Sequence, residues 1–254
     1  MILDLFNLDG KVALVTGAGQ GLGQGMALAL AEAGADIASL DRTGCEGTCE
    51  SVRALGMKYH ETVLDLREAS VETLNDVVAN IAKELGRIDI LVNNAGTIRR
   101  TPAIDFSEKD WDDVLQINLK AAFFLSQAVA RVMMSQGSGK IINIASMLSF
   151  QGGINVISYA AAKSALAGVT RGLANEWAKH NINVNAIAPG YMATDNTAAL
   201  RADPNRAPVI LDRIPAGRWG TPDDLKGAVV FLASSASDYM NGAIIPVDGG
   251  WLAR

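Results

Sequence analysis

Short apolar runs alternate along the chain with longer stretches that have a helical repeat of apolar positions. The runs are at residues 12–16, 36–40, 59–64, 88–92, 140–145, 183–188 and 243–247. The helical stretches are at 21–33, 70–85, 111–135, 158–180 and 223–234. Continuous apolar runs are typical of strands that are buried on both faces of a sheet. Strand and helix in alternation predict βαβ units, and therefore a parallel sheet with helices on both faces.

The pattern indicates one domain rather than two. No linker rich in proline and serine divides the chain, and no internal repeat is visible. We therefore expect residues 1–254 to form a single doubly wound, Rossmann-like α/β domain of about seven strands. The least regular segment is 190–220, which contains Pro204, Pro208 and Pro215. A loop of this length in a compact domain is usually a lid or a binding element.

Composition excludes several classes of protein. Hydrophobic residues make up 49% of the chain, which excludes a mostly disordered protein. The net charge of −5 gives no electrostatic reason to expect nucleic-acid binding. There is no signal-peptide pattern and no apolar run of the roughly 20 residues that a membrane span needs. The expected location is therefore the cytoplasm, away from membranes. Cys45 and Cys49 suit neither a disulfide nor a metal site, so we expect free thiols and no metal.

A glycine-rich segment follows the first predicted strand and precedes a helix. Residues 16–23 read Thr-Gly-Ala-Gly-Gln-Gly-Leu-Gly. Glycines let the backbone turn sharply and approach a pyrophosphate, and the helix N-terminus offers unpaired N–H groups to the anion. The alternative is a tight strand-to-helix turn without a ligand. The candidate cofactor-binding residues here are Gly17, Gln20, Gly21, Leu22 and Gly23.

Asp41 closes the second predicted strand and bears on the choice of dinucleotide. A carboxylate there can accept hydrogen bonds from the ribose hydroxyls of NAD and repel the additional phosphate of NADP. Arg42 follows directly and could offset that repulsion. We expect NAD as the cofactor. The alternative for Asp41 is a solvated residue at a strand end.

Tyr159 and Lys163 lie one helical turn apart and would share a helix face. Ser146 ends the fifth predicted strand, and Asn118 lies on the preceding long helix. Removing a hydride from a carbinol requires a base for the hydroxyl proton, and free tyrosine, with a pKa of about 10, is a poor base near neutrality. A neighbouring ammonium and a positive nicotinamide ring should both favour the phenolate. Taken singly, each residue also has an ordinary structural explanation.

The spacing of Gly17, Gly21 and Gly23 and the order Asn118, Ser146, Tyr159, Lys163 resemble the short-chain dehydrogenase/reductase family, and the resemblance covers essentially the whole chain. It implies an NAD-dependent oxidoreductase in which Tyr159 is the acid/base, Ser146 holds the substrate oxygen and Lys163 binds the nicotinamide ribose. Asn118 would extend a proton path through its backbone and a water. Position 20 is a glutamine and not the basic residue that NADP-preferring relatives often have there, which also favours NAD. The resemblance implies further cofactor contacts from Asp65, Leu66, Asn93, Ala95, Gly96, Pro189, Gly190 and Thr194. For the segment around Asn93, a structural role without ligand contact is an equal alternative.

The substrate is expected to be a small anion. Arg99 and Arg100 are adjacent cations that could hold a carboxylate, or else form a solvated turn or a subunit contact. The other candidates for the substrate pocket are Ser146, Gln151, Tyr159 and Tyr191. Stretches at 98–100, 106–113, 145–153, 175–185 and 191–194 resemble a bacterial subgroup that acts on keto-deoxy sugar acids from pectin-derived uronates. The resemblance also implies a homotetramer.

Two other functions remain open at this point. One is an NADP-dependent reductase of another sugar, polyol or acyl ketone, against which Asp41, Gln20 and the paired arginines argue. The other is a non-catalytic dinucleotide sensor, which would not need Tyr159 and Lys163.

Overall fold

The computed structural model describes residues 1–254 and contains one seven-stranded sheet, in which every neighbouring pair of strands is parallel. The strand order is β3-β2-β1-β4-β5-β6-β7. The strands are β1 (Val12–Thr16), β2 (Asp36–Asp41), β3 (Tyr59–Val63), β4 (Ile90–Asn93), β5 (Gly139–Ile144), β6 (Ile182–Pro189) and β7 (Ile244–Val247). The predicted fold class is confirmed.

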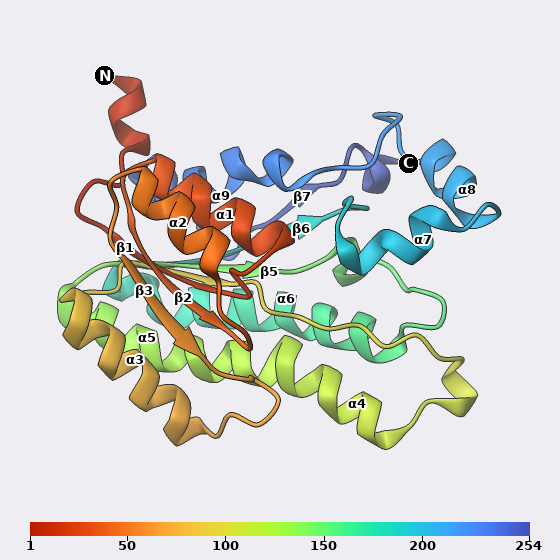
Figure 1. Ribbon diagram of the computed structural model, residues 1–254, viewed down its shortest axis with the longest axis horizontal. Helices are drawn as coiled ribbons and strands as arrows, with labels where there is room; N and C mark the ends of the chain where they lie inside the picture. Colours follow the sequence, from red (N-terminus) through yellow and green to blue (C-terminus); the bar gives the residue numbers. More distant parts are fainter.

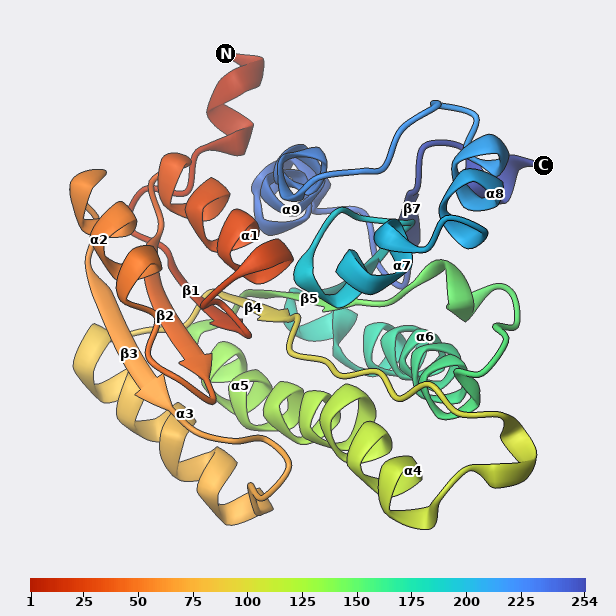
Figure 2. The ribbon, with the colours of Figure 1, turned by 45° about the vertical axis from the view of Figure 1, so that its right-hand side comes forward.

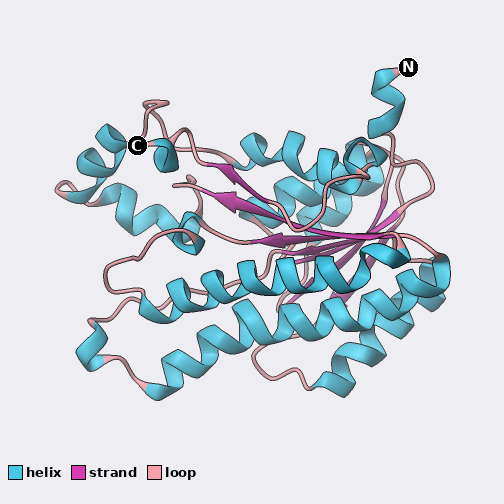
Figure 3. Cartoon of the chain, turned by 180° about the vertical axis from the view of Figure 1, so that it is seen from behind, coloured by secondary structure: helices cyan, strands magenta, loops and turns pink.

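Helices cover both faces of the sheet (Figures 1 and 2). One face carries α1 (Gly21–Glu32), α2 (Glu46–Ala54) and α9 (Lys226–Ala233), and the other carries α3 (Val71–Leu85), α5 (Ala122–Gln136) and α6 (Ile157–Trp177). Helix α4 (Glu108–Leu115) passes through a π-helical turn (Gln116–Ala121) into α5. Helices α7 (Ala198–Ala202) and α8 (Arg206–Arg213) lie near the C-terminus, seen again from behind in Figure 3.

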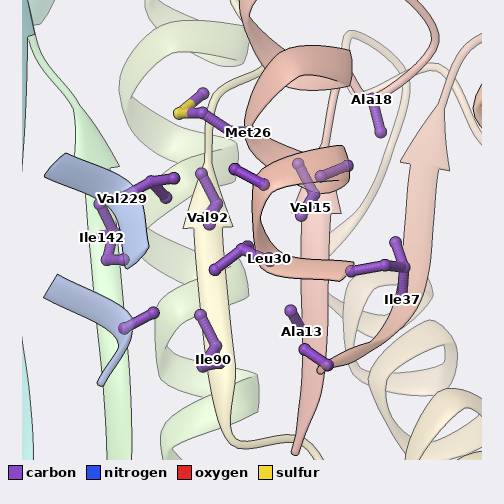
Figure 4. Close-up of a cluster of buried hydrophobic side chains, with 14 of the residues drawn as sticks. Ala13, Val15, Ala18, Met26, Leu30, Ile37, Ile90, Val92, Ile142 and Val229 are labelled. Atoms are coloured by element: carbon purple, nitrogen blue, oxygen red, sulfur yellow. The ribbon is translucent and has the colours of Figure 1, made fainter. Parts of the chain in front are cut away.

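The hydrophobic core explains why the central strands are continuous apolar runs. All five residues of β1 are buried, and Met26 and Leu30 of α1 and Val229 of α9 pack against the sheet beside it (Figure 4). Burying each such side chain contributes about 1.5–3 kcal/mol. The two edge strands differ from the prediction of burial on both faces. Most residues of β3 and β7 are only partly buried or exposed, because each strand has a neighbour on one side only.

Three helical segments differ from their predictions. The helix predicted at 111–135 begins earlier, at Glu108, because the Ser107 hydroxyl accepts a hydrogen bond from the Asp110 N–H and caps it. Helix α2 was not predicted, since it is short and mostly polar and buries only Thr48 and Val52. Segment 190–220 contains α7 and α8 rather than loop alone. Pro208 is tolerated in the first turn of α8, where its missing N–H would have no partner within the helix.

The strand order predicts a crevice at the carboxyl ends of the strands. The chain passes from β1 through β2 to β3 on one side, and then crosses to β4 on the other side of β1. The helices that follow β1 and β4 therefore lie on opposite faces. In such sheets, ligands bind outside the carboxyl ends of the strands at this switch point.

Candidate active site

A cleft of about 990 Å³ lies at the carboxyl ends of the strands. Its walls come from the ends of β1, β2, β4, β5 and β6, from the first part of α6, and from α7, α8 and the C-terminal turn. This volume is at the upper end of what small-molecule sites usually offer. The chain therefore has room at its switch point for a ligand as large as a dinucleotide together with a small substrate.

The glycine segment forms one end of the cleft and fits a pyrophosphate. Gly21 has a φ of +58°, which favours glycine. A Cβ on Gly23 would lie 1.9 Å from the Gly17 carbonyl oxygen, so no side chain can be accommodated there. The first turn of α1 contains no acidic residue, and Gln20 at its N-cap makes no capping hydrogen bond with its side chain. The predicted cofactor residues Gly17, Gln20, Gly21, Leu22 and Gly23 all line the cleft.

Asp41 lies beside this loop at the end of β2. Its Oδ2 accepts a hydrogen bond from the Gly19 N–H at 2.9 Å, which fixes the carboxylate against the glycine segment. Arg42 also lines the cleft. Further along, Asp65 and Leu66 line it too, and Asp65 pairs with Arg67 at 2.6 Å. This pairing holds the pKa of Asp65 below its usual value, chiefly through the side-chain hydrogen bond from Arg67.

The segment after β4 divides into structural and cleft-facing residues. Asn93 does not line the cleft. Its side chain is buried and donates to Ser126 Oγ and Asn143 Oδ1, both at 2.9 Å. Asn94, the next residue of the same segment, donates from Nδ2 to the Thr16 carbonyl at 2.9 Å and so holds the glycine segment in place. The remaining predicted cofactor residues, Ala95, Gly96, Pro189, Gly190 and Thr194, all line the cleft.

The four predicted catalytic residues all line the cleft, although they come from three separate elements. Ser146 follows β5, and its Oγ accepts from the Leu148 N–H at 3.1 Å. Tyr159 and Lys163 share a face of α6, with the Lys163 Nζ 5.6 Å from the Tyr159 ring centroid. The same ammonium donates to the Ile144 carbonyl at the end of β5 at 2.6 Å. Helix α6 and strand β5 thus hold the group together.

Burial dominates the electrostatics of this centre. It raises the pKa of Tyr159, while the Ser146 hydroxyl and the Arg100 guanidinium act in the opposite direction. Burial also lowers the pKa of Lys163 to about 8. Arg100 thus adds a second positive charge that favours the phenolate, beside the ammonium of Lys163 that the sequence analysis singled out.

Asn118 lies on the π-helical turn between α4 and α5. Its Nδ2 donates to the Thr97 carbonyl at 2.8 Å and to the Val114 carbonyl at 2.9 Å. Its Oδ1 is buried without a hydrogen-bond partner. The additional residue in a π turn changes the direction of the side chains that follow, and such turns are frequent at functional sites. Here the π turn carries Asn118, whose buried Oδ1 accepts no hydrogen bond in the wall of the cleft.

The two adjacent arginines line the cleft but differ in their surroundings. Arg99 is paired with Asp110 at 3.0 Å and Asp113 at 3.9 Å, so its charge is largely offset. The side chain of Arg100 makes one hydrogen bond, to the Asn196 carbonyl at 3.2 Å, and no ion pair. The predicted substrate residues Gln151 and Tyr191 also line the cleft. Arg100 is thus the member of the pair that keeps its charge available.

Cys45 is buried and Cys49 partly buried, and both are free thiols. None of the helices combines the length and the apolar character needed to span a bilayer.

Known proteins resemble this chain over its whole length. A family model described as enoyl-(acyl carrier protein) reductase matches residues 17–252. The 2-dehydro-3-deoxy-D-gluconate 5-dehydrogenase of Dickeya dadantii is 63% identical, with 100% of both chains covered. An Agrobacterium tumefaciens crystal structure with bound NADP, provisionally named 2-deoxy-D-gluconate 3-dehydrogenase, is 52% identical with a TM-score of 0.93, covering 99% of this chain and 100% of that one. A Burkholderia cenocepacia gluconate 5-dehydrogenase, in complex with NADP and tartrate, is 41% identical with a TM-score of 0.95, with both chains fully covered.

These likenesses extend over the sheet, the glycine segment and the residues around Tyr159 alike. The family model and the related proteins all bear the names of oxidoreductases. They confirm the family that the motifs indicated, and with it a nicotinamide dinucleotide as the cofactor. The chain belongs to the short-chain dehydrogenase/reductase family and is an oxidoreductase.

Proposed function

We propose that this chain is an NAD-dependent dehydrogenase that oxidises a secondary hydroxyl of a keto-deoxy sugar acid, of the 2-dehydro-3-deoxy-D-gluconate 5-dehydrogenase type. The observation that carries the proposal is full-length identity of 63% to an enzyme of that name, combined with an unpaired guanidinium beside the catalytic centre. An anionic substrate gives that guanidinium a function.

The roles of the catalytic residues follow from their positions. Tyr159 takes the hydroxyl proton, and Ser146 donates to the substrate oxygen and keeps it beside the phenol. Lys163, anchored to the end of β5, faces the Tyr159 ring and binds the ribose next to it. The buried Oδ1 of Asn118 is available to a water on the proton path. When bound, the nicotinamide ring supplies the hydride acceptor.

The preference for NAD rests on the charge at the end of β2. The Asp41 carboxylate is held beside the glycine segment, where the adenosine ribose would lie. An additional phosphate there would face this fixed negative charge. Arg42 acts in the opposite direction, and the two related crystal structures contain NADP. We give Asp41 the greater weight because a hydrogen bond fixes its carboxylate.

The substrate end of the cleft is proposed to consist of Arg100, Gln151 and Tyr191, with segment 190–220 of the single domain as its binding element. The charge of Arg100 attracts an anionic substrate into the cleft, while Arg99, which is paired with two aspartates, keeps the loop after β4 attached to α4. The cytoplasmic location and the homotetramer remain predictions from the sequence.

A substrate panel tests the proposal. The purified protein is mixed with NAD or NADP and with 2-dehydro-3-deoxy-D-gluconate, gluconate, a neutral polyol or an apolar alcohol, and absorbance at the NADH wavelength is followed. We expect the largest kcat/KM with the keto-deoxy acid and NAD. Faster turnover of a neutral polyol or an apolar alcohol would contradict the substrate class, and faster turnover with NADP would contradict the cofactor. No turnover of any alcohol or ketone would indicate a dinucleotide sensor.

A further inference from the structure

Three aromatic side chains and one arginine form a stack at the end of the cleft near the C-terminus. Tyr191 packs edge-on against Trp219, at 5.4 Å between centroids, and against Trp251, at 4.8 Å. The guanidinium carbon of Arg213 lies 4.0 Å from the centroid of the Trp251 ring. The stack joins the segment after β6, the end of α8 and the C-terminal turn, and α8 lies beside the C-terminus in Figures 1, 2 and 3.

The stack holds Arg213 in one place without using its hydrogen-bonding capacity. Trp251 is only 4% exposed, and its Nε1 has no acceptor, so packing rather than a hydrogen bond fixes the ring. A guanidinium that lies over an aromatic face keeps the N–H donors at its edge free. Arg213 has no carboxylate within ion-pair distance, in contrast to Arg99, Arg87 and Arg218, each of which is paired with an aspartate. Arg213 is therefore a fixed cation without a counter-ion.

The charges around the two tyrosines show where this cation lies in the cleft. Burial raises the pKa of Tyr191, and the charges that oppose it are those of Arg206 and Arg213, followed by Arg100. The only arginine that acts on Tyr159 in this way is Arg100. These charges agree with the stack on Trp251, which places Arg213 at the Tyr191 end of the cleft.

The balance of charge at this end is positive, although the whole chain is acidic. Arg100, Arg206 and Arg213 line the cleft without an ion pair, and Asp195 is the one carboxylate that segment 190–220 adds to the lining. Charge alone would attract any anion. The stacking distinguishes Arg213, because a cation held in a fixed orientation can also position its ligand.

We propose that Arg213, positioned by Trp251, binds the carboxylate of the substrate at the Tyr191 end of the cleft and thereby determines which hydroxyl reaches Tyr159. This inference rests on the proposed function and deepens it. An acid held at that end presents to Tyr159 a hydroxyl several carbons from its carboxylate. A 2-hydroxy acid such as lactate, whose hydroxyl adjoins the carboxylate, cannot reach both groups.

Paired substrates test the inference. The kinetics of Arg213→Gln are measured with 2-dehydro-3-deoxy-D-gluconate and with its uncharged methyl ester. We expect KM for the acid to rise about 10- to 100-fold, the loss that follows removal of a charge-assisted hydrogen bond, with kcat within about twofold. kcat/KM for the ester should remain within about twofold. Arg213→Lys should recover part of the affinity for the acid, and lactate should not be oxidised. Arg53→Gln, which removes a cation from the exposed surface of α2, is the matched control. It should leave KM and kcat/KM unchanged for both the acid and the ester.

Trp251 provides the second variant. Trp251→Phe keeps a ring face under the guanidinium and should behave almost as the wild type, whereas Trp251→Leu should reproduce the selective rise in KM. Thermal melting and NAD binding establish that each variant is folded. Equal effects on acid and ester, or an unchanged KM for the acid in Arg213→Gln, would overturn the inference while the proposed function stands. A wild-type protein that oxidises no sugar acid would overturn both.

Discussion

The ammonium of Lys163 donates a hydrogen bond to the carbonyl oxygen of Ile144 at 2.6 Å, in a position where the lysine is only 3% exposed. The bond links the turn of α6 that carries Tyr159 and Lys163 to the end of β5. Burial still lowers the pKa of Lys163 to about 8. This hydrogen bond therefore does not compensate fully for the water that the buried ammonium has lost. The residue that positions the catalytic centre is therefore also a source of instability in the ligand-free protein.

This cost should be visible in the pH dependence of stability. A lysine in the unfolded chain has a pKa of about 10.4, so between pH 8 and 10 the unfolded state binds more protons than the folded state. The free energy of unfolding should then rise with pH in this window, by about 2 kcal/mol from this group. Urea denaturation at pH 8 and pH 10 measures the rise, and Lys163→Met should reduce it by about that amount. Equal rises in the two proteins would show that Lys163 keeps its ordinary pKa. Tyr159, whose pKa is raised, opposes the effect only above pH 10.

Tyr159→Phe separates chemistry from binding. The variant keeps the ring that packs beside Lys163 and removes only the hydroxyl that exchanges the proton. General acid/base groups contribute about 10²- to 10⁴-fold to rates, so kcat should fall by at least about 100-fold. The dissociation constant for NAD, measured by fluorescence titration, should stay within about twofold. Retention of most of the activity would exclude Tyr159 as the acid/base.

Arg100 should influence the ionisation of the phenol. Its positive charge lowers the pKa of Tyr159 against the effect of burial, so Arg100→Gln should raise that pKa. The pH at which kcat/KM for alcohol oxidation reaches half its maximum should then move upward. Full pH profiles with a neutral alcohol as the substrate test this apart from any contact with a carboxylate.

Arg99→Gln is the matched comparison for Arg100→Gln. The charge of Arg99 is already offset by Asp110 and Asp113, so the pH profile should not move. The ion pairs are partly exposed, and their loss should lower the free energy of unfolding by at most about 1 kcal/mol. Identical shifts in the two variants would mean that the pairing of Arg99 has no electrostatic consequence.

The sequence predicted the fold and the shared helix face of Tyr159 and Lys163 because both depend on local patterns. The central strands are apolar throughout, and Tyr159 and Lys163 share a face of α6 simply because they are four residues apart. The edge strand β3 illustrates the limit. Its boundaries were predicted to within one residue, but its exposure depends on the absence of a neighbour beyond it.

Residues whose role depends on distant partners were not predictable in this way. Adjacent arginines look equivalent in the sequence, and only the position of α4 shows that Asp110 neutralises one of them. Asn93 resembles a cleft residue, but its side chain faces Asn143, which lies 50 residues away in the sequence. Arg213 and Trp251 are separated by 38 positions and meet only because α8 packs against the C-terminal turn.

Asp41→Asn tests the basis of the cofactor preference. An asparagine can still accept the hydrogen bond from the Gly19 N–H, so the glycine segment should keep its conformation while the negative charge disappears. A phosphate on the adenosine ribose would then meet Arg42 without an opposing carboxylate, and the ratio of kcat/KM for NAD to that for NADP should fall at least about tenfold. Asp36→Asn, at the opposite end of β2 and outside the cleft, removes the same charge and should leave the ratio unchanged. If Asp41→Asn also leaves it unchanged, the choice of dinucleotide depends on other residues.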